Sequence, residues 1–460
     1  MTGILWFRAD LRLADNPALH AAAAGGRPVL PVFVWDEAAM GARAPGGAAR
    51  WWLHHSLASL ARDLAARGAV LHIARGRAEE VLPRLAAATG ATEVHAMRAY
   101  EPWARAQSER VHKALSGALV LHRSALLHEP HLVRTGSSAP YSVYTPFSRA
   151  LFAAGDPPPP IPAPARLAGI AAPGGEPREA LALLPTRNWA EAFPRHWRPG
   201  EAGAAERLSR FAARGLKGYA ARRNTPGIEG TSGLSPHLRW GEISPRQLWH
   251  AAREAGAAGP DAFLKEILWR EFAYHLLWHR PEMEAEPLRP EFRAFPWARD
   301  PALLGAWRKG RTGYPIVDAG MRQLWATGWM HNRVRMIVAS FLVKHLLQPW
   351  QEGEAWFWDT LVDADPASNP ASWQWVAGCG MDAAPYFRIF NPVLQGEKFD
   401  PDGAYVRRWV PEVAALPDRF VHRPWEAPSP PPGYPKPVVE HAAARARALA
   451  AFAAIRREAA

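Results

Sequence analysis

The sequence predicts an α/β N-terminal domain with a five-stranded parallel doubly wound sheet, followed by an all-α C-terminal domain. Three observations lead to this prediction. Short apolar runs alternate with alanine-rich helical stretches in the first part of the chain, helical periodicity dominates beyond residue 200, and a segment rich in Pro and Gly lies between them. With 460 residues, 48% of them hydrophobic, the chain is long enough for two sizeable cores.

The N-terminal domain is predicted to span residues 1–127. Helix-length intervals separate five apolar runs, which are the predicted strands 4–7, 29–34, 70–73, 93–97 and 118–121. The turn after the first strand, Arg8-Ala-Asp-Leu-Arg12, has no Gly-rich fingerprint. A nicotinamide cofactor is therefore not expected there.

Residues 128–200 form the predicted connector, which contains Gly155-Asp-Pro-Pro-Pro-Pro160. Residues 201–460 form the predicted helical domain. Gly, Pro and Thr-Gly breaks delimit its helices, which are expected at 262–279, 315–327, 332–347 and 355–361. A Pro-rich stretch at 428–437 precedes a last helix rich in Ala and Arg.

The charge balance favours a polyanionic partner. Lys and Arg outnumber Asp and Glu by 55 to 43, which gives a net charge of +12, so nucleic acid is the first candidate and an acidic membrane surface the second. The single cysteine, Cys379, excludes an intramolecular disulfide framework and a cysteine-rich metal site. The N-terminus does not resemble a signal peptide and no apolar stretch has membrane-spanning length. We therefore expect a cytoplasmic protein with no membrane partner and no metal.

The stretch from Asp363 to Trp375 combines two carboxylates, an amide and two indoles within thirteen residues, namely Asp363, Asp365, Asn369, Trp373 and Trp375. A calcium loop is excluded because Pro follows the second Asp, the sixth position is not Gly, and Gln374 stands where a bidentate Glu is needed. On these residues alone, a site for a large aromatic ligand and a core segment with helix-capping carboxylates are equally good interpretations.

Two other segments present polar and aromatic groups on one helix face. Glu266, Trp269 and Arg270 share a face at i, i+3 and i+4 spacing, although an exposed Glu-Arg pair beside a packed Trp is the simpler interpretation of this segment alone. Asn332 and Met336 also share a face, and two arginines flank it. They could line a pocket or a core edge.

Two further segments could contact phosphate groups. Thr231-Ser-Gly-Leu-Ser235 is a hydroxyl-rich turn before a helix, which could hold a phosphate or act as a simple cap. Basic and aromatic residues alternate from Tyr386 to Phe399 and include Arg388 and Lys398. This segment could be a nucleic-acid surface or a solvated edge.

Taken together, these segments resemble the photolyase/cryptochrome family, and within it the bacterial cyclobutane pyrimidine dimer DNA photolyases. The resemblance extends over nearly the whole chain, with the motifs in family order. They are Trp6-Phe-Arg-Ala-Asp-Leu-Arg-Leu-Ala-Asp-Asn-Pro-Ala-Leu19, Thr231-Ser-Gly-Leu-Ser-Pro-His237, Trp269-Arg-Glu-Phe272, Gly313-Tyr-Pro-Ile-Val-Asp-Ala-Gly-Met-Arg322, Gly328-Trp-Met-His-Asn-Arg-Val-Arg-Met336 and Asp382-Ala-Ala-Pro-Tyr-Phe-Arg-Ile-Phe-Asn-Pro392.

The resemblance implies FAD in the helical domain. The residues implied to bind its phosphate and sugar side are Tyr219, Thr231, Ser232, Gly233, Leu234, Ser235 and Arg270. Asp363, Asp365 and Asn369 are implied near the isoalloxazine ring and ribose, with Arg335 paired to Asp363. Asn369 is expected to face the flavin N5, and an amide there fits a member that keeps fully reduced flavin.

The resemblance also implies light-driven repair of cyclobutane pyrimidine dimers by electron transfer from excited reduced FAD to a flipped-out lesion. The implied lesion pocket consists of Glu266, Trp269, Asn332, Met336 and Trp375, and the implied electron-transfer chain of Trp373, Trp350 and Trp297. The DNA contacts are implied to be Arg223, Arg333, Arg388 and Gln395. The implied partner is ultraviolet-damaged DNA, and a monomer is expected.

One departure from the family concerns the second chromophore. Trp103-Ala104 replaces the Asn-Glu pair with which folate-using members contact their antenna, so a deazaflavin, another flavin or no antenna remain open. A cryptochrome-type blue-light receptor is the alternative function. A nucleic-acid-binding or nucleotide-binding scaffold without flavin is the alternative from another class.

Overall fold

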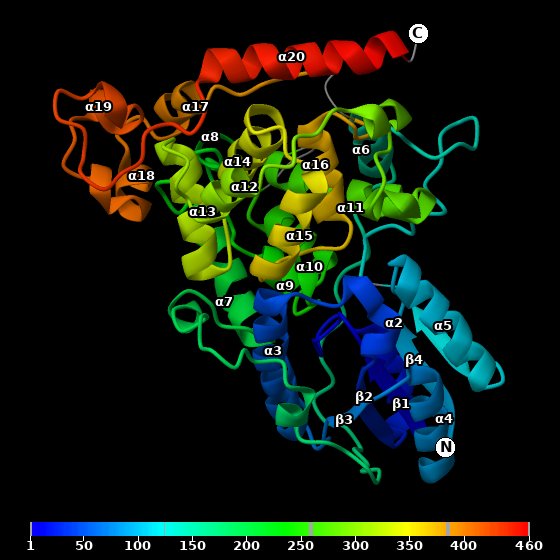
Figure 1. Ribbon diagram of the computed structural model, residues 1–460. Helices are drawn as coiled ribbons and strands as arrows, with labels where there is room; N and C mark the ends of the chain where they lie inside the picture. Colours follow the sequence, from blue (N-terminus) through cyan, green and yellow to red (C-terminus); the bar gives the residue numbers. More distant parts are fainter. Residues whose placement is uncertain (1, 124, 257–260, 383–386, 459–460) are drawn as a thin grey trace. The chain divides into compact units, whose positions relative to one another are not determined.

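The computed structural model describes residues 2–123, 125–256, 261–382 and 387–458. It divides into two compact units, shown in one colour gradient along the chain in Figure 1. Unit 1 contains residues 1–217 and 232–281, and unit 2 contains residues 218–231 and 282–460.

Unit 1 contains a parallel sheet with the strand order β3-β2-β1-β4-β5. The strands are β1 Thr2–Phe7, β2 Val29–Trp35, β3 His72–Arg75, β4 Ala91–Met97 and β5 Leu119–His122. The predicted five-stranded parallel doubly wound sheet is confirmed, with small shifts at the strand ends. β1 and β4 begin two residues earlier than predicted, and β3 is displaced by two residues at both ends, since Val70 is 67% exposed and lies outside the strand.

Helices pack against the sheet of unit 1, which explains why its strands are nearly continuous apolar runs. All seven residues of β2 are buried. Ile4 and Trp6 of β1 pack with Val81 and Leu82, which belong to α4 on one face of the sheet. The helices of unit 1 are α1 Pro17–Ala22, α2 Glu37–Met40, α3 Gly47–Ala65, α4 Ala78–Thr89, α5 Pro102–Ala114, α6 Tyr144–Ala153, α7 Glu201–Arg210, α9 Ser235–Arg239, α10 Pro245–Glu254 and α11 Ala262–His279, with shorter 3-10 or π turns at Ala24–Gly26, Gly41–Arg43, Arg178–Leu181, Phe193–Arg195 and Phe211–Gly215.

The motif after β1 organises the carboxyl end of that strand. The Arg12 guanidinium is buried and donates to the carbonyl oxygens of Asp15 at 2.8 Å and Gly241 at 3.0 Å. The side-chain oxygen of Asn16 accepts from the Leu19 amide at 3.0 Å and so caps α1. These contacts give the N-terminal motif a structural role in unit 1.

Unit 2 is helical apart from its loops, and all described residues from 201 to 460 form helices and loops, as predicted for the C-terminal domain. Its helices are α8 Tyr219–Arg222, α12 Pro301–Arg308, α13 Pro315–Thr327, α14 Asn332–Ser340, α15 Trp350–Thr360, α16 Ser368–Ala377, α17 Pro392–Phe399, α18 Ala404–Trp409, α19 Asp418–Val421 and α20 His441–Glu458, and its shorter turns are η7 Pro290–Ala294, η8 Phe341–His345, η9 Pro411–Val413 and η10 Pro424–Glu426; a further 3-10 turn, Pro281–Glu284, joins the units. Helices α11 and α13 have the predicted bounds.

Two predicted helix boundaries are wrong. The helix predicted for 332–347 is α-helical only to Ser340, because residues 341–345 form the π-helical turn η8. The helix predicted for 355–361 begins five residues earlier, at Trp350 directly after Pro349. Gly353, a poor helix former, lies in that first part and favours a later start on propensity alone.

The core of unit 2 fixes the position of Trp373 on α16. Gly353 of α15 lies so close to this indole that an added Cβ would overlap the ring and would approach Leu342 Cδ2 to 2.7 Å. None of the helices among the described residues is long and apolar enough to cross a membrane.

Candidate functional site

A cavity of about 170 Å3 lies within unit 2, between α14, α16 and the segment that precedes α16. A single water needs only about 10–15 Å3, so this cavity has room for a larger group. Its lining includes seven residues that the sequence assigned to flavin, lesion or electron transfer, namely Asn332, Arg335, Met336, Asp363, Asp365, Asn369 and Trp373. Residues separated by more than 40 positions in the sequence thus share one site.

Asp363 presents an unsatisfied oxygen at this cavity. The expected pair with Arg335 is present, because the guanidinium donates to Asp363 Oδ2 at 2.8 Å while its Nε donates to the Met330 carbonyl at 2.7 Å. The other oxygen, Oδ1, is buried and has no partner among the described residues. A buried carboxylate oxygen without a donor costs free energy, so a ligand with an N–H or O–H group fits here.

Asn369 and Asp365 differ in their hydrogen bonds, since Asn369 donates to Glu354 whereas Asp365 accepts from backbone amides. The Asn369 amide nitrogen donates to both the carbonyl oxygen of Glu354 at 3.1 Å and its Oε1 at 2.9 Å, which uses both N–H groups and leaves Oδ1 as the acceptor for a ligand. Asp365 Oδ1 accepts from the amides of Ala367 and Ser368 at 3.0 and 2.7 Å. Asp365 therefore supports the start of α16 as well as lining the cavity.

His331 is a residue that the sequence reasoning left without a role. It caps α14 by accepting from the Arg333 amide at 3.1 Å through Nδ1, so Nε2 carries the proton. Burial, together with the positive charges of Arg335, Arg333 and Arg223, lowers the pKa of His331 to about 4. This imidazole is neutral at physiological pH and adds no charge beside the cavity.

The three tryptophans of the predicted electron-transfer chain belong to the same part of unit 2. Trp373 and Trp350 are buried within one apolar cluster, and the half-buried Trp297 packs against it. Trp373 has ring contacts with Phe357 at 5.0 Å and with Trp307 at 6.2 Å between centroids. Exposure thus increases from Trp373, at the cavity, to Trp297.

A basic groove adjoins the cavity, with a volume of about 540 Å3. Three of the four predicted DNA contacts, Arg333, Arg388 and Gln395, line it together with Lys398. Arg333 is held by Asn224, whose Oδ1 accepts from it at 2.8 and 3.2 Å. The fourth, Arg223, is not in the lining. Burial lowers the pKa of Arg333, and the positive charge of Arg223 lowers it further.

Met336 lines both the cavity and the groove. A ligand in the cavity and a polyanion in the groove could therefore both contact this side chain. Positions 383–386 of the neighbouring motif lie outside the described residues.

The residues predicted for the phosphate side of FAD are divided between the units. Tyr219 and Thr231 belong to unit 2, whereas Ser232, Gly233, Leu234, Ser235 and Arg270 belong to unit 1. Gly233 has a φ of 62°, a left-handed conformation that favours glycine, and Ser232 Oγ accepts from the Leu234 amide at 3.3 Å. Arg270 donates to the Ala125 carbonyl at 3.0 Å.

The predicted lesion residues on α11 also belong to unit 1. Trp269 is 38% exposed, and Tyr144 of α6 stacks on its ring with centroids 3.5 Å apart and planes inclined by 7°. The Tyr144 hydroxyl donates to the Lys265 carbonyl at 2.7 Å. Tyr144 therefore fixes the orientation of the Trp269 indole. No signal in the sequence indicates this role, because Tyr144 lies 125 positions before Trp269. Glu266 is half-buried on the same helix.

Next to these residues, Glu271 anchors the start of the connector. Its Oε2 accepts from the amides of Leu127 and His128 at 3.0 and 3.1 Å, and burial raises the pKa of Glu271 to about 7. Ala104 is buried within α5 and offers no polar contact for a second chromophore. The described residues contain no group of three or more His, Cys, Asp or Glu side chains that could hold a metal ion.

Family models and curated relatives match nearly the whole chain. Residues 3–165 match the family model described as DNA photolyase, and residues 263–454 match the model described as the FAD binding domain of DNA photolyase. A deoxyribodipyrimidine photo-lyase of Agrobacterium fabrum is 50% identical over 473 residues, covering 99% of this chain and 98% of the relative. Cryptochrome-1 of Arabidopsis thaliana is 39% identical over 448 residues, covering 92% of this chain and 65% of the relative. The crystal structure of a bacterial class III photolyase from Agrobacterium tumefaciens has a TM-score of 0.95 at 50% identity and covers 99% of this chain and 98% of that chain.

Proposed function

Because the chain belongs to the DNA photolyase family, we propose that it splits cyclobutane pyrimidine dimers in DNA in a light-driven reaction that depends on FAD. The observation that carries the proposal is the position of Met336, which lines both the cavity of about 170 Å3 and the basic groove. A lesion that leaves the DNA stack could thus reach a ligand held in the cavity.

The residues of the cavity suit a flavin. Bound FAD would supply light absorption and the electron that the lesion receives. Asp363 Oδ1 would accept from an N–H group of the ring system, and the Arg335 guanidinium beside it offsets the negative charge of the carboxylate. Asn369 Oδ1 would accept from N5–H, the form that nitrogen has in reduced flavin, because the amide nitrogen is already used on Glu354.

The residues predicted for the lesion pocket would bind the dimer. In this proposal Trp269 and Trp375 stack on the dimer, Glu266 hydrogen-bonds its carbonyl or amide edge, and Asn332 and Met336 complete the pocket. The exposure of Trp269 supports this role, since 38% of the residue remains accessible although Tyr144 stacks on its ring.

The groove and the tryptophans would serve DNA binding and reduction of the cofactor. Arg223, Arg333, Arg388 and Gln395 would contact the phosphate backbone, so affinity falls as salt rises. Trp297, Trp350 and Trp373 would carry electrons from the surface to the cofactor, which agrees with the half-buried position of Trp297 and the full burial of the other two.

The test of the proposed function is the loss of thymine dimers from an ultraviolet-irradiated oligonucleotide incubated with purified protein under blue light. A dark control and the flavin spectrum are recorded together, and the spectrum also shows whether a second chromophore copurifies. Repair only under light supports the lyase. Flavin reduction under light without dimer loss favours the cryptochrome-type receptor, the alternative suggested by the similarity to Cryptochrome-1. A protein without flavin would contradict both.

Glu266→Ala tests the hydrogen bond to the lesion. We expect repair per absorbed photon to fall by about tenfold, the effect of losing one hydrogen bond to a developing charge, while flavin content stays normal. Glu254→Ala, at the exposed end of α10, is the matched control. An unchanged repair yield in Glu266→Ala would remove this residue from the mechanism.

A further inference from the structure

Lys344 is a buried lysine in the π-helical turn η8 that directly follows α14. Its side chain is 4% exposed, whereas lysines are rarely buried without a pairing group. Single π-helical turns commonly occur at functional sites, because the wider turn places side chains where an α-helix would not.

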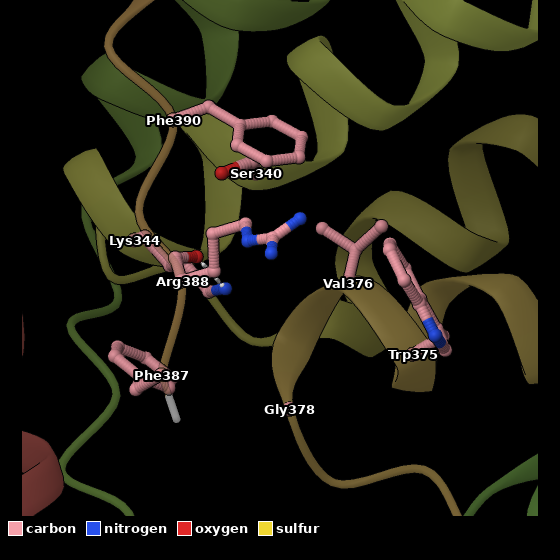
Figure 2. Close-up of a pocket in the computed structure, with 8 residues that line it drawn as sticks. All are labelled: Ser340, Lys344, Trp375, Val376, Gly378, Phe387, Arg388 and Phe390. Carbon is pink, nitrogen blue, oxygen red and sulfur yellow. Dashed lines mark hydrogen bonds between the residues drawn. The ribbon is translucent and has the colours of Figure 1, made fainter. Parts of the chain in front are cut away.

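The Lys344 ammonium group contacts the segment that carries Arg388. It donates to the Arg388 carbonyl oxygen and lies 4.5 Å from the centroid of the Phe387 ring. Figure 2 shows Lys344 against the Arg388 backbone, with the Arg388 side chain extending away from it toward Val376. The ammonium group thus binds the backbone of this segment and not an acidic side chain.

The segment from 387 to 391 is not held by a helix or a strand, since none of its residues has regular secondary structure. Its side chains nevertheless line two hollows. Arg388 and Phe390 border the basic groove, and they also border a small cavity of about 20 Å3 whose lining includes Lys344 and Trp375. The carbonyl that Lys344 binds therefore belongs to a residue that faces the groove.

We propose that Lys344 is a positioning residue for DNA binding, which holds the Arg388 carbonyl and so directs Arg388 into the basic groove. The chemical group recognised there is the phosphate backbone of the strand that carries the lesion. This inference rests on the proposed function, in which Arg388 contacts DNA phosphate. Lys344 itself touches neither the lesion nor the cofactor in this role.

The charge on Lys344 is titratable near neutral pH. Burial lowers the pKa of Lys344 to about 7, the charge of Arg388 acts in the same direction, and Cys379 opposes it. The neighbouring His345 is neutral, because burial lowers its pKa to about 3. Since a charged donor forms a hydrogen bond about twice as strong as a neutral one, the hold on Arg388 weakens as the pH rises through 7.

The test measures dark binding of the flavin-loaded protein to a duplex oligonucleotide with one thymine dimer, by fluorescence anisotropy. We expect Lys344→Met to weaken binding by about tenfold, the effect of one lost charge-assisted hydrogen bond. Lys309→Met, which removes an exposed lysine at the end of α12, is the control and is expected to bind like the wild-type protein. Lys344→Met should keep its flavin and melt at or above the wild-type temperature, because a buried charge is removed.

A double-mutant cycle separates positioning from a general structural effect. If Lys344 acts through Arg388, the double variant Lys344→Met/Arg388→Ala binds no more weakly than Arg388→Ala alone. Additive losses, or wild-type affinity in Lys344→Met, would overturn the inference.

The pH profile gives a second measurement that does not require the variant at the buried site to fold well. The DNA affinity of the wild-type protein should fall between pH 6 and 8.5, and the control Lys309→Met should show the same fall. Folded Lys344→Met should show no such fall. A flat wild-type profile would contradict the role of the ammonium group. Absence of dimer-dependent binding by the wild-type protein would overturn the proposed function and this inference together, whereas wild-type binding with an unaffected variant would overturn the inference alone.

Discussion

Gly353→Ala tests whether the close approach of α15 to Trp373 determines the stability of unit 2. The added methyl group would overlap the indole and would lie 2.7 Å from Leu342 Cδ2, closer than real Cβ contacts. Overpacking of a core costs about 1–3 kcal/mol, and a rigid indole as the obstacle places this case at the upper end. Alanine is preferred over glycine within a helix by about 1 kcal/mol, which offsets part of that cost.

The expected net loss is therefore about 2 kcal/mol, which lowers the melting temperature by about 4–8 °C in a domain of this size. Gly305→Ala in α12 is the matched control, because a Cβ there meets nothing within 4 Å. That variant should gain about 1 kcal/mol from helix propensity alone. Differential scanning calorimetry of both variants measures the difference, and the rate of flavin reduction under light shows whether the Trp373 ring has moved. If Gly353→Ala melts at or above Gly305→Ala, the indole does not pack on α15 as described.

Three further predictions concern single side chains. Tyr144→Ala should weaken binding of dimer-containing DNA by about three- to tenfold, because a stacked pair contributes about 0.5–1.5 kcal/mol. Tyr144→Phe keeps the ring and should bind normally. Equal affinities of Tyr144→Ala and Tyr144→Phe in a binding titration would refute this prediction. Burial raises the pKa of Glu271 from 4.5 to about 7, so the folded state keeps a proton that the unfolded chain releases between these values, and stability is lost as the pH rises through that window. Glu271→Gln should thus equal the wild type in free energy of unfolding at pH 4.5 and exceed it by about 3 kcal/mol at pH 7.5, as measured by urea titration; a constant difference between the two pH values would contradict the assignment. Asp363→Asn should lose about 2 kcal/mol of stability and most of its flavin, because Arg335 loses its charged partner. The control Asp359→Asn changes an exposed residue and should retain wild-type stability in thermal melts and wild-type flavin content in absorbance spectra. Normal flavin content in Asp363→Asn would argue against a flavin contact.

The sheet of unit 1 could be predicted from sequence because strands covered on both faces are continuous apolar runs, and turn residues separate these runs. The ends of the strands were less certain. Val70 continues the apolar run before β3, yet it is exposed, and hydrophobicity alone does not show that the strand begins only at His72.

The helix boundaries in unit 2 were harder to predict because tertiary packing decides them. Gly353 reduces helix propensity at the start of α15, but Trp373, twenty positions later, requires a residue without a side chain there. The π-helical turn η8 has no periodic signature over its five residues, so the sequence favoured one helix from 332 to 347. For that reason Lys344 could not be placed next to Arg388 before the structure was known.

Asn369 shows how far the prediction of a site residue extends. The motif identifies the residue and the family resemblance suggests the ligand atom beside it, but an amide can present either an oxygen or an NH2 group to that ligand. The choice is made by Glu354, which lies on α15 and accepts both amide hydrogens through its carbonyl and carboxylate oxygens. A carboxylate at position 369 could not donate to Glu354 and would place two acidic groups within hydrogen-bond distance of each other. The requirement for an amide therefore comes from the protein side of the cavity as well as from the ligand side, and residues 354 and 369 act as one unit that presents an acceptor oxygen.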